Sequence, residues 1–268
     1  MDLPAVVRPG TPAPTGVPTV GAIWRRPLPH LDGRTATRIL CRTILTLFHR
    51  HALGFEGLEH IGPDRDPFIL ALNHSQRPEA VLVPAWLCFF RGGRMIHFMA
   101  DWNFQLVPGL AWVIRQHDPI HVVRKDARPR FLNRFKERFR LQPPPLTEAR
   151  DRLRQGRSIG IFPEGTVNRH PYRLLRGQAG VARLSLDLGI PVIPGGIRFP
   201  RHDDGQPIGD REPFHVRLGA PLSAGAVGPE PGESVPTFHR RVMAAISTLS
   251  GKEWQHDARR TKYGFSNP

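Results

Sequence analysis

The sequence has 268 residues, of which 40% are hydrophobic, so the chain is long enough for one large domain or two small ones with a sizeable core. Its 38 basic and 23 acidic residues give a formal net charge of +15, which favours an anionic partner, either a nucleic acid or a membrane surface. Two cysteines, Cys41 and Cys88, exclude a disulfide framework and fit a reducing compartment.

No segment is predicted to cross a membrane. The longest apolar runs, 81–90 and 106–114, each contain a proline and fall well short of the ~20 residues that span a bilayer. The first residues show no basic segment followed by a hydrophobic core, so we expect no signal peptide. We therefore expect a cytoplasmic protein that binds peripherally to the inner face of the membrane.

The N-terminal part combines an expected arm with an expected helix. Residues 1–33 contain many Pro and Gly with little apolar periodicity, which predicts a flexible arm. Residues 35–52 predict an amphipathic helix, which either packs on the core or docks on anionic lipid. Its apolar face is expected to hold Leu40, Ile44, Leu47 and Phe48, and its basic face Arg38, Arg42 and His49.

The rest of the chain alternates between predicted strands and helices. Strands are expected at 67–72, 94–100, 119–123, 158–162, 190–193 and 214–218. Helices are expected at 80–90 with a break at Pro84, at 130–141 with a row of Phe131, Phe135 and Phe139, and at 147–155, 177–188 and 236–249. This order indicates an α/β domain over residues 34–250, with a largely parallel twisted sheet flanked by helices, and a polar tail over 251–268.

The most informative segment is Asn73-His74-Ser75-Gln76-Arg77-Pro78-Glu79, which follows the predicted strand 67–72. A neutral imidazole can take a proton from a hydroxyl near neutral pH, and a carboxylate can fix its tautomer and stabilise the resulting cation. Positions five apart point about 140° apart on a helix with 3.6 residues per turn. The two side chains can therefore meet only if His74 lies in the turn and Glu79 in the first helical turn. The same spacing also occurs often by chance.

A second segment, Gly160-Ile161-Phe162-Pro163-Glu164-Gly165-Thr166, ends a predicted buried strand in a Pro-Gly turn with a carboxylate and a hydroxyl. Ligands of α/β sheets bind at the carboxyl ends of strands, so this turn is a candidate part of a binding site. An ordinary surface turn with a solvated glutamate is the alternative interpretation.

Four segments together resemble the lysophospholipid and glycerolipid acyltransferases, typified by 1-acylglycerol-3-phosphate acyltransferase. Asn73-His74 with Glu79 resembles the His-x-x-x-x-Asp motif of that family, and 162–166 resembles its Phe-Pro-Glu-Gly-Thr block. The stretch from Gly109 to Arg124 is similar to the second block and 190–194 to the fourth, although each is weak alone. The segments occur in the family's order over residues 54–198.

The resemblance implies an α/β O-acyltransferase of phospholipid biosynthesis. It would move a fatty acyl group from acyl-CoA or acyl carrier protein, as co-substrate, to a hydroxyl of a lysophospholipid or related lipid. His74 would be the general base and Glu79 its partner. Substrate binding would involve Asn73, Arg124, Glu164, Gly165, Thr166 and Arg169. The expected partners are membrane lipids and the acyl donor, and no metal ion or bound cofactor is expected.

Two positions depart from the family pattern. Glu79 stands where the family has aspartate, which keeps the charge but moves it by one methylene group. Val167 stands where the family has an anion-holding arginine, so a phosphate headgroup beside Thr166 is in question. Candidate substitutes are Arg169, Arg173 and Arg176. These departures leave open a non-catalytic, peripheral lipid-binding protein on the same fold.

Two other functions fit the sequence less well. Gly156-Arg157-Ser158-Ile159-Gly160 matches the Gly-x-Ser-x-Gly pattern of serine hydrolases. That pattern needs a strand before the serine and a helix after it, whereas the predicted order here is reversed. Nucleic-acid binding rests on net charge alone, because the basic residues are dispersed and lack a recognition motif, so no nucleic-acid partner is expected.

Overall fold

A twisted seven-stranded sheet forms the centre of the computed structural model, which describes residues 16–106, 112, 115–123, 126, 130–136, 143–202, 205–223 and 233–256. The order across the sheet is β1-β7-β6-β2-β5-β3-β4. The strand bounds are β1 (Ala52–Glu56), β2 (Ile69–Leu72), β3 (His97–Asp101), β4 (Ile120–Val122), β5 (Ile159–Ile161), β6 (Val192–Arg198) and β7 (Phe214–Leu218). The strands from β6 to β4 are parallel, whereas β7 is antiparallel to β6 and parallel to β1. The predicted largely parallel sheet is confirmed.

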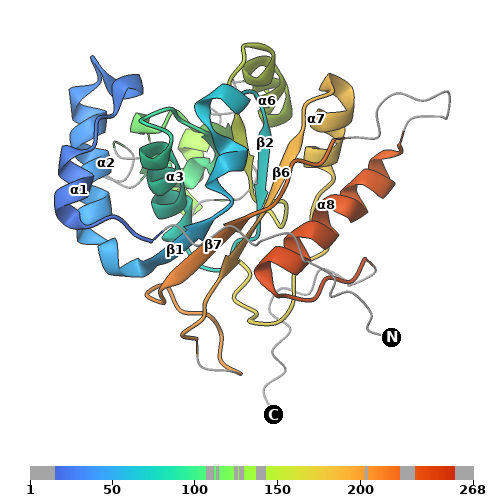
Figure 1. The fold of residues 1–268 in the computed structure, drawn as a ribbon. Helices are drawn as coiled ribbons and strands as arrows, with labels where there is room; N and C mark the ends of the chain where they lie inside the picture. Colours follow the sequence, from blue (N-terminus) through green and yellow to red (C-terminus); the bar gives the residue numbers. More distant parts are fainter. Residues whose placement is uncertain are drawn as a thin grey trace, which may run out of the picture.

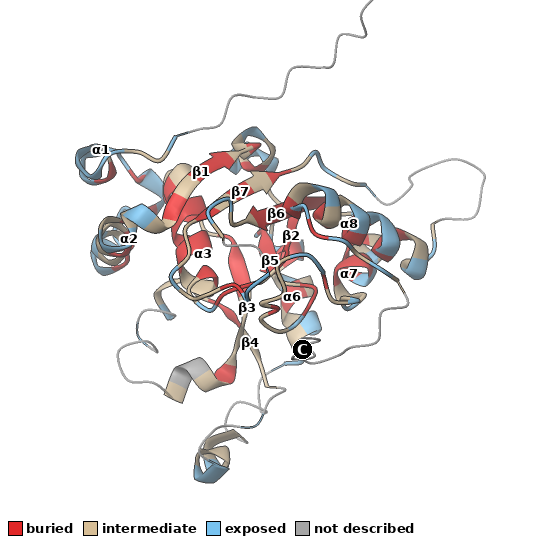
Figure 2. Cartoon of the chain, turned by 90° about the horizontal axis from the view of Figure 1, so that it is seen from below, coloured by how far each residue is buried: buried red, intermediate tan, exposed pale blue. Residues whose placement is uncertain are grey.

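Helices cover both faces of this sheet (Figure 1). One layer consists of α1 (Val20–Arg25), α2 (Thr35–Leu47) and α3 (Glu79–Phe90), and the other of α6 (Pro145–Arg154), α7 (Gly180–Leu188) and α8 (Val235–Ser250). Figure 2 shows buried residues along the strands and on the helix sides that face them, and exposed residues on the outer sides. No helix in the described part of the chain has both the length and the apolar character that a bilayer span requires.

The core lies in two apolar clusters, one on each face of the sheet. The central strand β2 shows how the chain supplies both. Leu70 and Leu72 belong to one cluster, whereas Ile69 and Ala71 belong to the other, because successive strand residues point to opposite faces. All four residues of β2 are buried, which explains why this segment reads as a continuous apolar run in the sequence.

The structure contains each of the six predicted strands, with small shifts in their bounds. It adds β1, which the sequence analysis misses because the strand is short and contains Gly54. The predicted break of the helix at Pro84 is wrong, since α3 continues through this residue. Proline inside a helix removes one backbone hydrogen bond, and here the fully buried surroundings of α3 hold the helix together.

The segments around the sheet differ from expectation in two places. Residues 16–33 contain α1 and the 3-10 helix Pro29–Leu31, and their buried side chains Ile23, Leu28 and Leu31 join the core. The structure thus differs from the predicted flexible arm over 16–33, while residues 1–15 lie outside the described part. Within the predicted helix 130–141, Arg130–Phe135 forms a 3-10 helix and Phe131 is 62% exposed; Phe139 lies outside the described residues.

The predicted amphipathic N-terminal helix corresponds to α2, but its faces are rotated from the prediction. The side chains buried against the core are Thr37, Cys41, Ile44 and Leu45. Leu47, expected on the apolar face, is 73% exposed, and the following Phe48 is 38% exposed. Packing on the core therefore accounts for one face of α2, and exposed apolar side chains remain at its C-terminal end.

Candidate active site

The two most informative sequence segments meet at one edge of the sheet. The turn with His74 follows β2, and the turn with Glu164 follows the neighbouring parallel strand β5. Because parallel strands end at the same edge, these turns lie side by side, where α/β sheets bind ligands. The backbone joins them directly: the N–H of Asn168 donates to the carbonyl of His74 at 2.7 Å.

The imidazole and the carboxylate of the first segment are in contact. Nδ1 of His74 lies 2.8 Å from Oε2 of Glu79, which also accepts the Ser75 backbone N–H at 2.8 Å. The contact confirms the predicted geometry, since His74 lies in the turn and Glu79 is the first residue of α3. The Glu79 side chain is fully buried and that of His74 is 12% exposed. A carboxylate on Nδ1 places the ring proton there and leaves the Nε2 lone pair available, and no described residue bonds to Nε2.

Glu164 joins the two turns through three donors. Its Oε1 accepts the His74 backbone N–H at 3.1 Å, and its Oε2 accepts Nδ2 of Asn168 at 2.7 Å and the Leu175 backbone N–H at 2.9 Å. Burial raises the pKa of Glu164, while these hydrogen bonds and the nearby Lys252 oppose that rise. An ionised carboxylate can only accept, which matches an environment built from donors. Glu164 therefore fixes the backbone of the catalytic candidate His74.

The other residues of the turn after β5 are more open. Gly165 has φ +66°, a left-handed conformation that side chains rarely adopt, and a Cβ there would lie 2.3 Å from Nε2 of Gln178. Thr166 is half-buried and Gly165 is exposed. These two predicted substrate-binding residues are thus accessible beside Glu164.

Asn73 occupies a different environment from the one predicted for a substrate contact. Its side chain is 1% exposed. Its Nδ2 donates to the carbonyl of Ile197 at 3.0 Å, and its Oδ1 accepts the N–H of the same residue at 2.7 Å. Both polar atoms are therefore bonded to β6, and the side chain positions the turn that carries His74.

An apolar cavity of about 290 Å³ lies beside the dyad. It is lined by Arg77, Pro78, Ala80, Val81, Pro84, Ile96, Phe98, Met99, Ala100, His117, Pro119 and Phe162. The Phe162 ring stacks on the His74 ring with a centroid distance of 4.4 Å and an interplanar angle of 22°. The same aromatic side chain thus borders both the imidazole and the cavity, so an apolar ligand in the cavity would lie next to His74.

Two predicted cationic contacts have separate outcomes. Arg169 donates through Nη2 to Oδ1 of Asp210 at 2.7 Å and through Nη1 to the carbonyl of Ile208 at 2.6 Å. The same Oδ1 accepts the Arg77 backbone N–H at 2.9 Å, so Asp210 connects its loop to the turn between His74 and α3. Arg124 lies outside the described residues.

Ser158 lies away from this site. It is buried just before β5, at the opposite edge of the sheet from the residues that follow β2. Its Oγ accepts the backbone N–H of Phe68 at 3.0 Å and donates to Asp66. Ser158 therefore has a structural environment, as the predicted strand context indicates. Among the described residues, no group of three or more His, Cys, Asp or Glu side chains could hold a metal ion.

The sequence analysis misses one charged residue of the site, Lys252. It follows α8 and is 4% exposed, and its Nζ donates to Oγ of Ser75 at 2.7 Å. The sequence offers no motif for it, because 177 residues separate the two partners and the lysine begins a polar segment.

Comparisons with known proteins agree with this arrangement. A family model described as Acyltransferase matches residues 53–198. Among solved structures, the chain is similar to the 1-acyl-sn-glycerophosphate (LPA) acyltransferase, PlsC, from Thermotoga maritima, with a TM-score of 0.54 and 20% sequence identity over 85% of each chain. At this identity the likeness concerns the fold. No curated protein matches the chain.

Proposed function

The chain belongs to the acyltransferase family, and from that premise we propose that it transfers a fatty acyl group from a thioester to the hydroxyl of a lysophospholipid or related lipid. The family match confirms the predicted enzyme class. The observation that carries the proposed chemistry is the contact between His74 and Glu79 at 2.8 Å, beside an apolar cavity.

In the proposed mechanism, Nε2 of His74 removes the proton of the acceptor hydroxyl as its oxygen attacks the thioester carbonyl. The new C–O bond forms, the C–S bond breaks, and the departing thiolate takes the proton back from the imidazolium. Glu79 fixes the ring tautomer and stabilises the transient cation through Nδ1. These steps use only protein groups and the two substrates, so we propose a reaction without a metal ion or bound cofactor.

The cavity suits the acyl chain of the donor. Its lining is largely apolar, and burial of methylene groups there is favourable by about 0.8 kcal/mol each. Phe162 lies between the cavity and His74, so a chain in the cavity would hold its carbonyl near the base. The donor is an acyl thioester of coenzyme A or of acyl carrier protein, and an assay with each donor distinguishes the two.

For the acceptor, we propose contacts from Gly165 and Thr166, which are accessible beside the base, and from Arg124. Arg169 is a weaker candidate for binding a phosphate group, because its Nη2 already donates to Oδ1 of Asp210 at 2.7 Å. Val167 supplies no charge at the position where the family has arginine. The proposal therefore specifies a lipid hydroxyl and leaves a phosphate headgroup optional.

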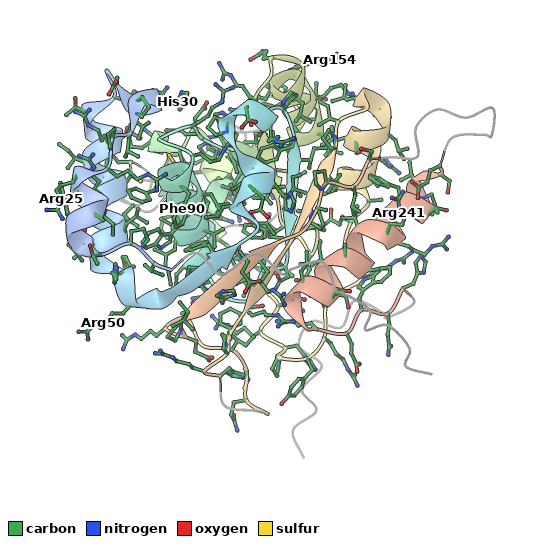
Figure 3. The ribbon with its side chains drawn as sticks, in the orientation of Figure 1. Arg25, His30, Arg50, Phe90, Arg154 and Arg241 are labelled. Atoms are coloured by element: carbon green, nitrogen blue, oxygen red, sulfur yellow. The ribbon has the colours of Figure 1, made fainter. Side chains whose placement is uncertain are left out.

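We further propose that α1 and α2 bind the surface of an anionic, cytoplasmic leaflet. The large apolar side chains exposed on this layer or just after it are Val20, Trp24, Ile39, Leu47 and Phe48. Figure 3 shows Arg25 and Arg50 pointing outward on the same side of the molecule. Exposed apolar groups with flanking arginines suit an interface where acyl chains and anionic headgroups meet.

The decisive experiment incubates purified protein with mixed lysolipids and either acyl-CoA or acyl carrier protein loaded with the same chain, and identifies the product by mass. Wild type should acylate a lysolipid, and His74→Ala should lose nearly all turnover. Equal product from both proteins would remove His74 as the base. Binding of lysolipid without product from wild type would favour the alternative, a non-catalytic lipid-binding protein, which the substitution at Val167 motivates.

A further inference from the structure

A lysine from the C-terminal end of the described chain is buried in the site. Lys252 follows Gly251, whose φ of +72° ends α8 in a left-handed turn. The side chain is 4% exposed, and its ammonium group donates to Oγ of Ser75 at 2.7 Å and to the carbonyl of His170 at 2.8 Å. A buried ammonium group is unfavourable unless carboxylates and acceptors compensate it, so its position requires a reason.

Two buried carboxylates act on this lysine electrostatically. Burial lowers the pKa of Lys252, while the charges of Glu164 and Glu79 raise it. Both glutamates are at most 3% exposed. Among the described residues, two charged groups thus act on Lys252. One is Glu79, the partner of His74, and the other is Glu164, which fixes the backbone of His74.

The hydrogen bonds place Lys252 one residue away from the dyad. Oγ of Ser75 accepts a hydrogen bond from the Lys252 ammonium group, and the backbone N–H of Ser75 donates to Oε2 of Glu79. The same Oε2 bonds to Nδ1 of His74. A continuous path therefore leads from the lysine through one serine to the imidazole.

Hydrogen bonds also hold the backbone around Lys252. The N–H of Leu174 donates to the carbonyl of Glu253 at 2.8 Å, and the N–H of Glu253 donates to the carbonyl of Tyr172 at 2.7 Å. Oγ of Ser247 donates to the carbonyl of Lys252 at 2.6 Å. The segment after α8 is thus bonded to the loop that follows Glu164, and this places Lys252 in the site.

We propose that Lys252 is a positioning residue for acyl transfer, which places a cation near the buried carboxylates Glu79 and Glu164 and holds Ser75, so that Glu79 keeps its place on His74. The proposal rests on the proposed function, and it adds a residue outside the four segments that resemble the family. Lys252 acts through Ser75 and Glu79, and it needs no contact with substrate.

The test compares Lys252→Met with Lys252→Arg and with the neighbouring control Glu253→Gln, whose exposed side chain takes no part in the path. Lys252→Met should lower kcat by roughly 10-fold to 100-fold, a part of what a general base contributes, with KM changed less than about twofold. The dependence of kcat/KM on pH should differ between Lys252→Met and wild type, because the substitution removes a charge beside the hydrogen-bonded path. Lys252→Arg should recover part of kcat, and Glu253→Gln should match wild type.

A second readout does not depend on turnover. The proton on Nδ1 of His74 should give a low-field NMR signal, assigned by its loss in His74→Ala, and Lys252→Met should shift or abolish it. A variant with unchanged kcat, pH profile and proton signal would overturn the role of Lys252. If wild type shows no acyl transfer, the proposed function fails, and the NMR comparison still decides whether Lys252 positions the pair.

Lys252→Met could be too unstable to purify, because removal of one buried charge leaves the carboxylates uncompensated. Ser75→Ala then takes its place, since it removes the hydroxyl that accepts the ammonium and keeps the backbone N–H that donates to Glu79. A smaller fall in kcat of the same kind is expected. A wild-type kcat and an unchanged proton signal in Ser75→Ala would contradict the path.

Discussion

Oε2 of Glu79 lies 2.8 Å from Nδ1 of His74, although the family motif has the shorter aspartate at this position. The extra methylene does not separate the pair. Glu79 begins α3, and its carboxylate reaches back to both the imidazole and the backbone N–H of Ser75. The departure from the motif therefore preserves the contact between the carboxylate and the imidazole.

The length of this side chain can be tested directly. Glu79→Asp should lower kcat by about tenfold, because a carboxylate one methylene shorter cannot keep both hydrogen bonds. Glu79→Gln should lower it by roughly 10³-fold to 10⁴-fold, since an uncharged partner neither fixes the tautomer nor stabilises the cation. Steady-state kinetics of the three proteins at saturating donor would check this order. A gain in turnover for Glu79→Asp would show that the native glutamate limits the reaction.

Glu164 should matter for stability as well as for turnover. Glu164→Gln leaves at least one of its three N–H donors facing an amide NH₂, and an unsatisfied buried donor costs about 1–3 kcal/mol. The melting temperature should fall, and kcat should fall with it because the His74 backbone loses an acceptor. Asn168→Ala is the matched comparison, since it removes one donor and leaves the carboxylate. Unchanged melting of Glu164→Gln would contradict the assigned contacts.

The sheet and the dyad were predictable because both depend on local patterns. The short, fully apolar run 69–72 is typical of a buried strand, and the segment from His74 to Glu79 contains both members of the pair. The helix start at Glu79 follows from Pro78, whose fixed φ suits a first turn. Local sequence was thus sufficient for the fold class and for the contact between His74 and Glu79.

The remaining parts of the site depend on distant contacts that no local pattern encodes. Lys252 meets Ser75 across 177 residues, and Arg169 meets Asp210 across 41. In the sequence, Lys252 looks like a solvated charge in a polar segment, and Arg169 is predicted as a substrate contact with no sign of its partner Asp210. Asn73 was predicted to contact substrate because it precedes His74, and the sequence gives no sign of its hydrogen bonds to Ile197 of β6.

The pair of Arg169 and Asp210 gives a pH-dependent contribution to stability. Burial raises the pKa of Asp210, but the hydrogen bonds from the Arg77 backbone and from Arg169 outweigh burial and hold the pKa below its ordinary value. A lowered folded-state pKa stabilises the fold above the unfolded-state value, and the effect is lost as pH falls through the folded-state value.

Asp210→Asn should therefore melt below wild type near pH 7, and the two melting temperatures should converge as pH falls below about 4. Thermal unfolding measured across that range checks the prediction. A difference that stays constant with pH would mean that packing, and not charge, accounts for it.

Asp210→Asn also frees Arg169, so a rise in turnover with lysophosphatidic acid relative to other lysolipids would identify a latent phosphate contact.

The cavity predicts a limit on acyl-chain length. Val81 lines it from α3, and Val81→Trp fills part of the 290 Å³ with a larger ring. This variant should prefer shorter acyl chains than wild type in a competition among acyl donors of graded length, whereas Val81→Ala should accept longer ones. Identical preferences in all three proteins would exclude the cavity as the acyl site.

The exposed end of α2 predicts a membrane-binding surface that is separable from stability. Leu47 is 73% exposed, so Leu47→Ser should change the free energy of unfolding by less than about 0.5 kcal/mol. A leucine that enters the acyl region contributes up to about 2 kcal/mol, so binding to anionic vesicles should weaken by roughly tenfold. Leu146→Ser on α6 is the matched control, since Leu146 is 40% exposed and lies on the other helix layer. An equal loss of vesicle binding in both variants would mean that apolar surface in general drives binding. Unchanged vesicle binding in both would exclude α2 as a membrane-binding element.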